Sequence, residues 1–160
     1  MPQASAKIEE ISRIADQLKR AFEGDAWHGP AVLEVLDGVN ARSAAKKPIS
    51  GAHSIWEIVL HIAAWDGAIR RRMAGQALQL SDEQDFPPVK DSSDAAWHRA
   101  LENLKQSHAE LIQALLAMPD YRLTAQVPGK DYDFYHMLHG AVQHELYHAG
   151  QIALLRKVAG

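Results

Sequence analysis

Two histidines near the end of the chain, His144 and His148, are the residues best suited to chemistry. Positions i and i+4 of an α-helix lie one turn apart on the same face, so both imidazoles would point the same way. That spacing suits a metal ion held between two ring nitrogens. The segment His144-Glu145-Leu146-Tyr147-His148 also matches the H-E-x-x-H pattern of zinc proteases, in which the glutamate is the general base.

The surroundings of the pair argue against a protease. A zinc protease needs a third metal ligand, commonly downstream, yet none of the twelve residues after His148 is His, Asp or Glu. The extended pattern of one protease class requires a glycine three residues after the second histidine, and Gly150 comes one residue too early. We therefore interpret the segment as an H-x-x-x-H pair. Glu145 projects about 100° away from His144 and is expected to pair at the surface.

A third histidine, His61, lies in a mostly apolar helical segment. A single histidine in such a place is more often a hydrogen-bonded core residue than a ligand. Helical bundles, however, build metal sites from side chains on facing helices, and His61 opposite the His144–His148 pair would complete a three-nitrogen site. Three neutral imidazoles would leave coordination positions open, as in catalytic rather than structural sites.

Some polar residues are placed to assist such a site. Gln151 follows His148 by three residues and faces the same way, so it is a candidate to hydrogen-bond a metal-bound water or a substrate. Glu57 lies one turn before His61, although helix capping is the simpler role for it. His28 is a candidate polar group at the mouth of the bundle.

The other histidines and the large aromatic residues need no special role. We expect His98 and His108 to be solvated on the polar side of their helix, and His53 to lie in a loop. The aromatic residues expected in the core, some of them lining a pocket, are Trp27, Trp56, Trp65 and Tyr147.

Four long segments carry apolar residues at spacings of three and four, which predicts amphipathic helices. Their approximate ranges are 6–23, 54–75, 93–118 and 133–158. A short helix is predicted from Pro30 to about Asp37. Because no strand is convincing, we expect one all-α domain over residues 1–160, a four-helix bundle with an extra short helix between the first and second long helices.

The ends of these helices carry recognisable caps. Ser54 and Glu57 form a capping-box sequence, while Ser5 and Gly24 bound the first helix. The remaining links are expected to be loops, the last with a brief extended piece: residues 39–53, 76–91 and 121–132. Links longer than ten residues usually cross a bundle end or shape the mouth of a site.

The composition of the chain argues against some classes of binding partner. The chain is 47% hydrophobic and 23% charged, as in ordinary globular domains, and it has no cysteine for a disulfide or a thiolate site. A net charge of −3 without a large basic patch argues against nucleic acid. The N-terminus lacks a signal-peptide core, and no apolar run approaches the roughly 18 residues that span a bilayer. We expect a cytoplasmic protein with no membrane partner.

Three segments, in this order and spacing, resemble the DinB-like superfamily, which includes the DinB/YfiT-type metal-binding four-helix proteins. In that family one histidine of the second long helix and an H-x-x-x-H pair on the last helix bind a divalent metal. By position these are His61, His144 and His148. The segments that carry the resemblance are Trp27-His28-Gly29-Pro30, His53-Ser54-Ile55-Trp56-Glu57-Ile58-Val59-Leu60-His61-Ile62-Ala63-Ala64-Trp65 and His144-Glu145-Leu146-Tyr147-His148-Ala149-Gly150-Gln151-Ile152.

The resemblance implies two kinds of function. Members of the family include metal-dependent S-transferases that use low-molecular-weight thiols, and a hydrolase is the close variant. The other kind is a non-catalytic, stress-associated metal-binding or dimerising bundle. Nickel, zinc and iron all accept imidazole ligands, so the sequence leaves the ion open. A small-molecule substrate, with a low-molecular-weight thiol as co-substrate, and a homodimer are the expected partners.

Overall fold

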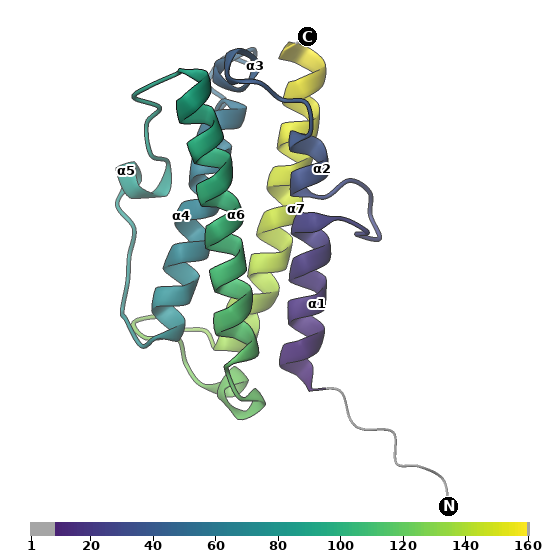
Figure 1. Ribbon diagram of the computed structural model, residues 1–160. Helices are drawn as coiled ribbons and strands as arrows, with labels where there is room; N and C mark the ends of the chain where they lie inside the picture. Colours follow the sequence, from purple (N-terminus) through teal and green to yellow (C-terminus); the bar gives the residue numbers. More distant parts are fainter. Residues whose placement is uncertain (1–8, 160) are drawn as a thin grey trace, which may run out of the picture.

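The chain folds into a bundle of four long helices joined by links that contain short helices (Figure 1). The computed structural model describes residues 9–159, and within this range it contains no strand beyond an isolated bridge between Gln126 and Asp133. The long helices are α1 (Glu10–Glu23), α4 (Ile55–Met73), α6 (Asp94–Leu116) and α7 (Phe134–Ala159). The short ones are α2 (Val32–Leu36), α3 (Ala41–Ala45), α5 (Asp82–Asp85) and the 3₁₀ helix η1 (Asp120–Thr124). The predicted all-α bundle is confirmed.

The four long helices do not simply alternate in direction along the chain, because the second and third of them run the same way. Figure 1 shows α1 and α7 running one way and α4 and α6 the other. Because α4 and α6 are parallel, the link at residues 76–91 returns along the length of the bundle, and α5 lies in it. Each long helix packs against two others, in the cyclic order α1, α7, α4, α6. None of the described helices is long and apolar enough to cross a membrane.

Side-chain caps fix where α4 and α1 begin, one of them local and the other from far along the chain. The Ser54 hydroxyl accepts the Glu57 backbone N–H at 3.1 Å, and the Glu57 carboxylate accepts the Ser54 N–H at 2.8 Å, as the capping box predicts. A contact far along the chain caps α1, since the Asp120 carboxylate accepts the backbone N–H groups of Glu10 and Ile11 at 2.9 and 3.0 Å. The predicted cap Ser5 lies outside the described residues, and Gly24 ends the helix as predicted.

Replacing Ser54 with alanine is expected to lower the free energy of unfolding by about 1 kcal/mol, because it leaves a helix-terminal N–H without its acceptor. Ser54 is only 1% exposed, so water cannot readily take its place. Ser81→Ala removes the equivalent hydroxyl from the exposed four-residue helix α5 and should cost less. Urea unfolding of both variants checks the prediction, and equal losses would contradict it.

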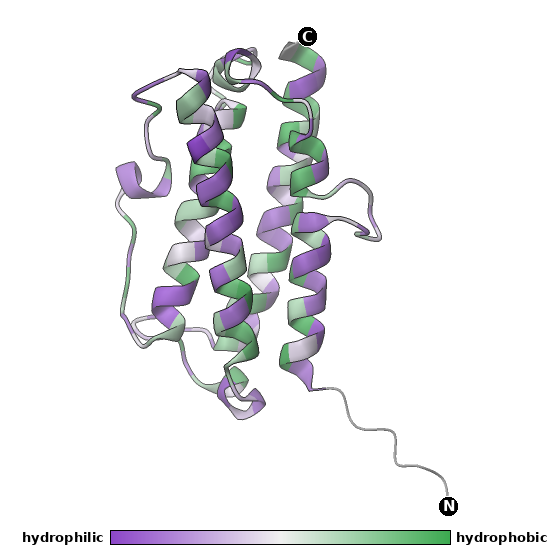
Figure 2. Ribbon diagram, in the orientation of Figure 1, coloured by the Kyte–Doolittle hydropathy of each residue, from purple (hydrophilic) through white to green (hydrophobic). Residues whose placement is uncertain are grey.

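The apolar faces of the helices meet in two buried clusters, and Figure 2 shows hydrophilic residues on much of the outer surface. One cluster joins the C-terminal end of α1 to α2, α3 and the upper halves of α4, α6 and α7. The other joins most of α1 to the lower halves of the same three helices and to η1. The two clusters hold the long helices at fixed positions, and so fix the side chains on their facing surfaces.

Several local expectations were wrong. The expected loop at 39–53 contains α3, and the link at 76–91 contains α5, whose four residues are too few to show a helical period. Trp27, expected in the core, is fully exposed, and Tyr147 is 66% exposed. Trp27 lies in the irregular link before α2, and the Tyr147 ring lies beside that of His148 on α7, outside the two apolar clusters.

Candidate metal centre

The three predicted ligands converge. His61 comes from α4, and His144 and His148 come from neighbouring turns of α7. His144 Nε2 lies 2.9 Å from His61 Nε2 and 3.0 Å from His148 Nε2. His61 and His148 are each 5% exposed, and His144 is half-buried. We call these three residues the histidine triad.

Hydrogen bonds on the other side of two rings orient them. His61 Nδ1 lies 2.7 Å from the backbone carbonyl of Asp85, and His148 Nδ1 lies 2.6 Å from Gln151 Oε1. Both partners are oxygen acceptors, so each Nδ1 carries the hydrogen. The Nε2 lone pairs of the neutral rings therefore point into the triad. This is the arrangement by which outer partners fix the tautomer of metal-binding histidines.

The triad is neutral at physiological pH. Burial, reinforced by the two neighbouring imidazoles, lowers the pKa of His144 to about 3. Burial also lowers the pKa of His148 to about 4 and holds that of His61 below its ordinary value. Protonated rings this close would repel one another, so the free lone pairs are available to an electron-pair acceptor.

The donor set fits a divalent metal ion. Ligands at right angles and about 2.1 Å from an ion are about 3.0 Å apart, which is close to the separations of the Nε2 atoms here. Convergent lone pairs on neutral rings repel one another, and a cation at their centre would convert that repulsion into three bonds. The three nitrogens would leave the remaining coordination positions to other molecules.

Two cavities meet at the triad. One, of about 530 Å³, is lined by His61, His148 and Gln151 together with apolar side chains such as Phe86 and Leu155. The other, of about 400 Å³, is lined by His61 and His144 and also by Arg72 and His136. An ion held by the triad would be open to both cavities.

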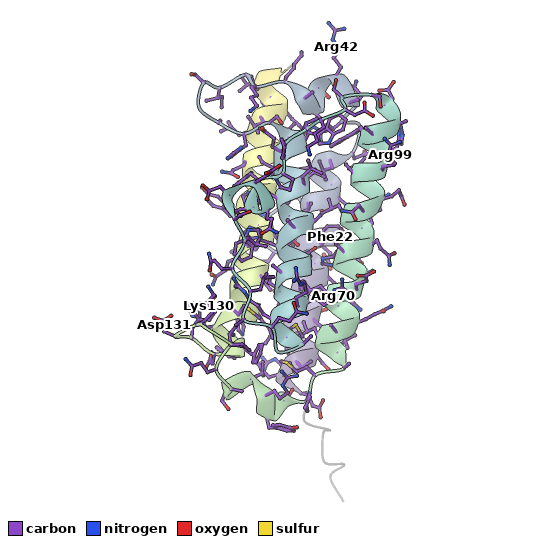
Figure 3. The ribbon with its side chains drawn as sticks, turned by 90° about the vertical axis from the view of Figure 1, so that its left-hand side faces the viewer. Phe22, Arg42, Arg70, Arg99, Lys130 and Asp131 are labelled. Carbon is purple, nitrogen blue, oxygen red and sulfur yellow. The ribbon has the colours of Figure 1, made fainter. Side chains whose placement is uncertain are left out.

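The link that contains α5 covers the triad, and Figure 3 shows α5 in front of α4 and α7. The Phe86 ring stacks on two histidine rings. Its centroid lies 3.9 Å from that of His61 and 3.7 Å from that of His53. The Asp85 carboxylate accepts the Trp65 indole N–H at 2.6 Å. Sequence reasoning missed Asp85 and Phe86 because they lie in a link with no periodicity. The one available signal was the cap sequence of Ser81 and Gln84, which begins α5.

The remaining candidates lie apart from the triad or play other roles. Gln151 contacts His148 on the side away from the three Nε2 atoms. Glu57 caps α4 and pairs with Lys47 at 2.8 Å. His28 is exposed in the link between α1 and α2, and lines neither cavity. His98 is exposed and His53 lies in the loop before α4, both as predicted.

Two predictions about ionisable residues were wrong. Glu145 is 1% exposed and does not reach the surface, and burial raises its pKa to about 8. His108 is 2% exposed, and its ring stacks on Phe22 of α1. Both side chains point into the bundle interior, because α7 and α6 each contact other helices on more than one face.

The sequence profile of the DinB superfamily matches residues 26–152, which is most of the chain and includes the whole triad. The chain belongs to the DinB superfamily. Comparison of this DinB-superfamily protein with curated proteins and with solved structures found no significant match. Membership confirms the resemblance carried by the histidine segments, and the helical bundle agrees with it.

Proposed function

We propose that this DinB-superfamily protein is a metal-dependent enzyme, of the thiol S-transferase or hydrolase type, with a divalent cation held by His61, His144 and His148. The observation that carries the proposal is the convergence of three Nε2 atoms between two cavities. A divalent cation there would lower the pKa of a thiol or water that it binds, and so supply a nucleophile near neutral pH.

The two cavities suit a reaction with two substrates. The larger one is mostly apolar and is walled by Phe86, Leu154 and Leu155, which would bind the apolar part of an electrophile and exclude water. The smaller one is lined in part by Arg72, which is 2% exposed and whose guanidinium donates to the Tyr132 hydroxyl at 3.2 Å and to the Leu78 carbonyl. A cation lining this cavity would favour a thiol that carries a carboxylate, such as glutathione.

A screen for thiol transfer tests the proposal. Monochlorobimane serves as electrophile with a panel of low-molecular-weight thiols, and zinc-, nickel- or iron-loaded protein made without a histidine tag is compared with metal-free protein. We expect conjugation that requires metal and is lost in His61→Ala. A parallel panel of ester and amide substrates tests the hydrolase type. Absence of metal-dependent turnover in both panels would overturn the catalytic proposal.

One observation favours dimerisation, which the second candidate, a non-catalytic dimerising bundle, requires. Three apolar side chains on α7 are more than half exposed and recur at helical spacing: Tyr147, Leu154 and Val158. A second copy of the chain packed on this face would bury them. Light scattering after size exclusion measures the assembly, and a dimer that lacks turnover in both panels would favour this candidate.

A further inference from the structure

Three ionisable side chains form a polar layer in the middle of the bundle core. Asp66 on α4, His108 on α6 and Glu145 on α7 are each at most 3% exposed. They separate the two apolar clusters, because on each helix residues of both clusters flank them: Ile62 and Ile69 around Asp66, Leu104 and Leu111 around His108, and Ala141 and Ala149 around Glu145. An apolar residue at any of these positions would avoid the cost of burying a polar group.

Apart from the contact between its two carboxyl groups, this core layer lacks the hydrogen bonds that such groups normally make. Among the described residues, six buried side-chain polar atoms have no hydrogen-bond partner, and five of them belong to Asp66, His108 and Glu145. Both nitrogens of His108 and both oxygens of Glu145 are included. Buried polar groups are nearly always paired, so the concentration of unpaired atoms at one point calls for a ligand.

The Asp66 and Glu145 carboxyl groups lie close enough to share a hydrogen bond, whereas the imidazole is too far from either of them for one. His108 Nδ1 lies 3.9 Å from Asp66 Oδ2 and 3.8 Å from Glu145 Oε1, beyond hydrogen-bond range. One potential ligand atom from each residue lies within 4.8 Å of the other two. Ligands about 2.1 Å from an ion at tetrahedral angles are about 3.4 Å apart, so closure by a few tenths of an ångström would bring His108 to that spacing from each carboxylate.

The packing around the imidazole holds it in place for this role. Phe22 of α1 stacks on the His108 ring, with 3.8 Å between centroids and 9° between planes. Figure 3 places Phe22 inside the bundle, between its two ends. The stacking leaves the ring edge, which carries the nitrogens, as the part that can face the carboxylates. All four long helices therefore contribute to this layer.

Charge also favours a divalent cation. Apart from His108, whose pKa burial lowers, no basic side chain among the described residues lies within 4.0 Å of the Asp66 or Glu145 carboxylate. Burial raises the pKa of both carboxyl groups, that of Glu145 to about 8, because their charged forms have no cationic partner there. A divalent cation would let both groups ionise. A divalent ion with two carboxylates and one neutral imidazole has no net charge. The mixed oxygen and nitrogen donors suit first-row transition metals such as manganese, iron and zinc better than calcium or magnesium.

We propose that Asp66, His108 and Glu145 form a second divalent-metal site, enclosed in the bundle core and separate from the histidine triad. Its ligands lie in the interior and line neither of the two cavities, so the ion would be structural, linking α4, α6 and α7. The ion would enter when the chain folds or when the bundle opens. The triad ion would exchange directly with solvent through the cavities.

Zinc stoichiometry tests the proposal. Protein without a tag is unfolded, refolded with excess Zn²⁺, separated from free metal and analysed for zinc. We expect about two zinc ions per chain, and two phases when EDTA is added: a fast phase from the triad and a phase at least roughly tenfold slower from the core. One zinc ion per chain, released in a single fast phase, would overturn the proposal without any variant.

Variants assign the two phases. The His61→Ala, His148→Ala double variant should lose the fast zinc and keep the slow one, while Asp66→Asn and Glu145→Gln should each lose the slow zinc and keep the fast one. Both amide substitutions preserve shape and remove charge, and circular dichroism checks folding. Glu102→Gln, on the exposed face of α6, is the matched control and should retain both. A slow zinc ion retained in both amide variants would place it elsewhere and contradict the site.

Discussion

Replacing His148 with alanine is expected to weaken zinc binding at the histidine triad more than roughly a hundredfold. Loss of an outer partner of a ligand alone typically costs about 10- to 100-fold in affinity, and loss of the ligand itself costs more. The side chain is buried between His61 and His144, with its Nε2 3.0 Å from that of His144. No other His, Asp or Glu of the described residues lies close enough to these two rings to complete a group of three ligands.

Competition with a chelating dye at pH 7.5 measures this affinity, following only the rapidly exchanging zinc. His98→Ala is the matched control, because His98 is exposed on α6 and its ring bonds only to its own helix, at the Asp94 carbonyl. We expect the control to bind zinc like the unaltered protein. Equal affinity of His148→Ala and His98→Ala would remove the triad from consideration as a metal site, and with it the proposed enzyme.

The sequence predicts those residues of the histidine triad and its surroundings whose positions follow from the period of an α-helix. His144 and His148 share a face because they are four residues apart, and Gln151 shares it because it is three further on. His61 was placed opposite them by the rule that bundles build sites from facing helices and by the DinB resemblance. Asp85 and Phe86 could not be placed in this way. They reach the triad through a link that runs back along the bundle, and no local pattern encodes where such a link lies.

The core layer was missed for a different reason. The apolar stripe of α6 contains Leu104 and Leu111, and His108 lies between them at core spacing. Average preference places histidine at the surface, but the period places this one in the interior. The same holds for Glu145. Its side chain projects about 100° around α7 from that of His144, and that face of the helix is also buried. For both residues, position in the helical period predicts burial better than the average preference of the residue type.

The second large effect is expected at Gln151, which touches His148 only on the side away from the ligands. Gln151→Leu removes the oxygen that accepts the His148 Nδ1 hydrogen at 2.6 Å, so the ring loses its orientation and its fixed tautomer. We expect zinc affinity at the triad to fall about 10- to 100-fold, as for other outer partners of metal-binding histidines. Dye competition on the rapidly exchanging zinc measures the change.

Gln151→Glu separates the hydrogen bond from simple packing. The carboxylate keeps an acceptor at the same place and makes the imidazole a stronger donor to the metal, so affinity should stay the same or increase. His98→Ala is again the matched control, because the His98 ring lies on α6 and bonds only to the Asp94 carbonyl of its own helix. If Gln151→Leu and Gln151→Glu bind zinc equally well, then packing of α4 against α7 alone orients the ring. The three Nε2 atoms would in that case converge without help from the outer hydrogen bonds.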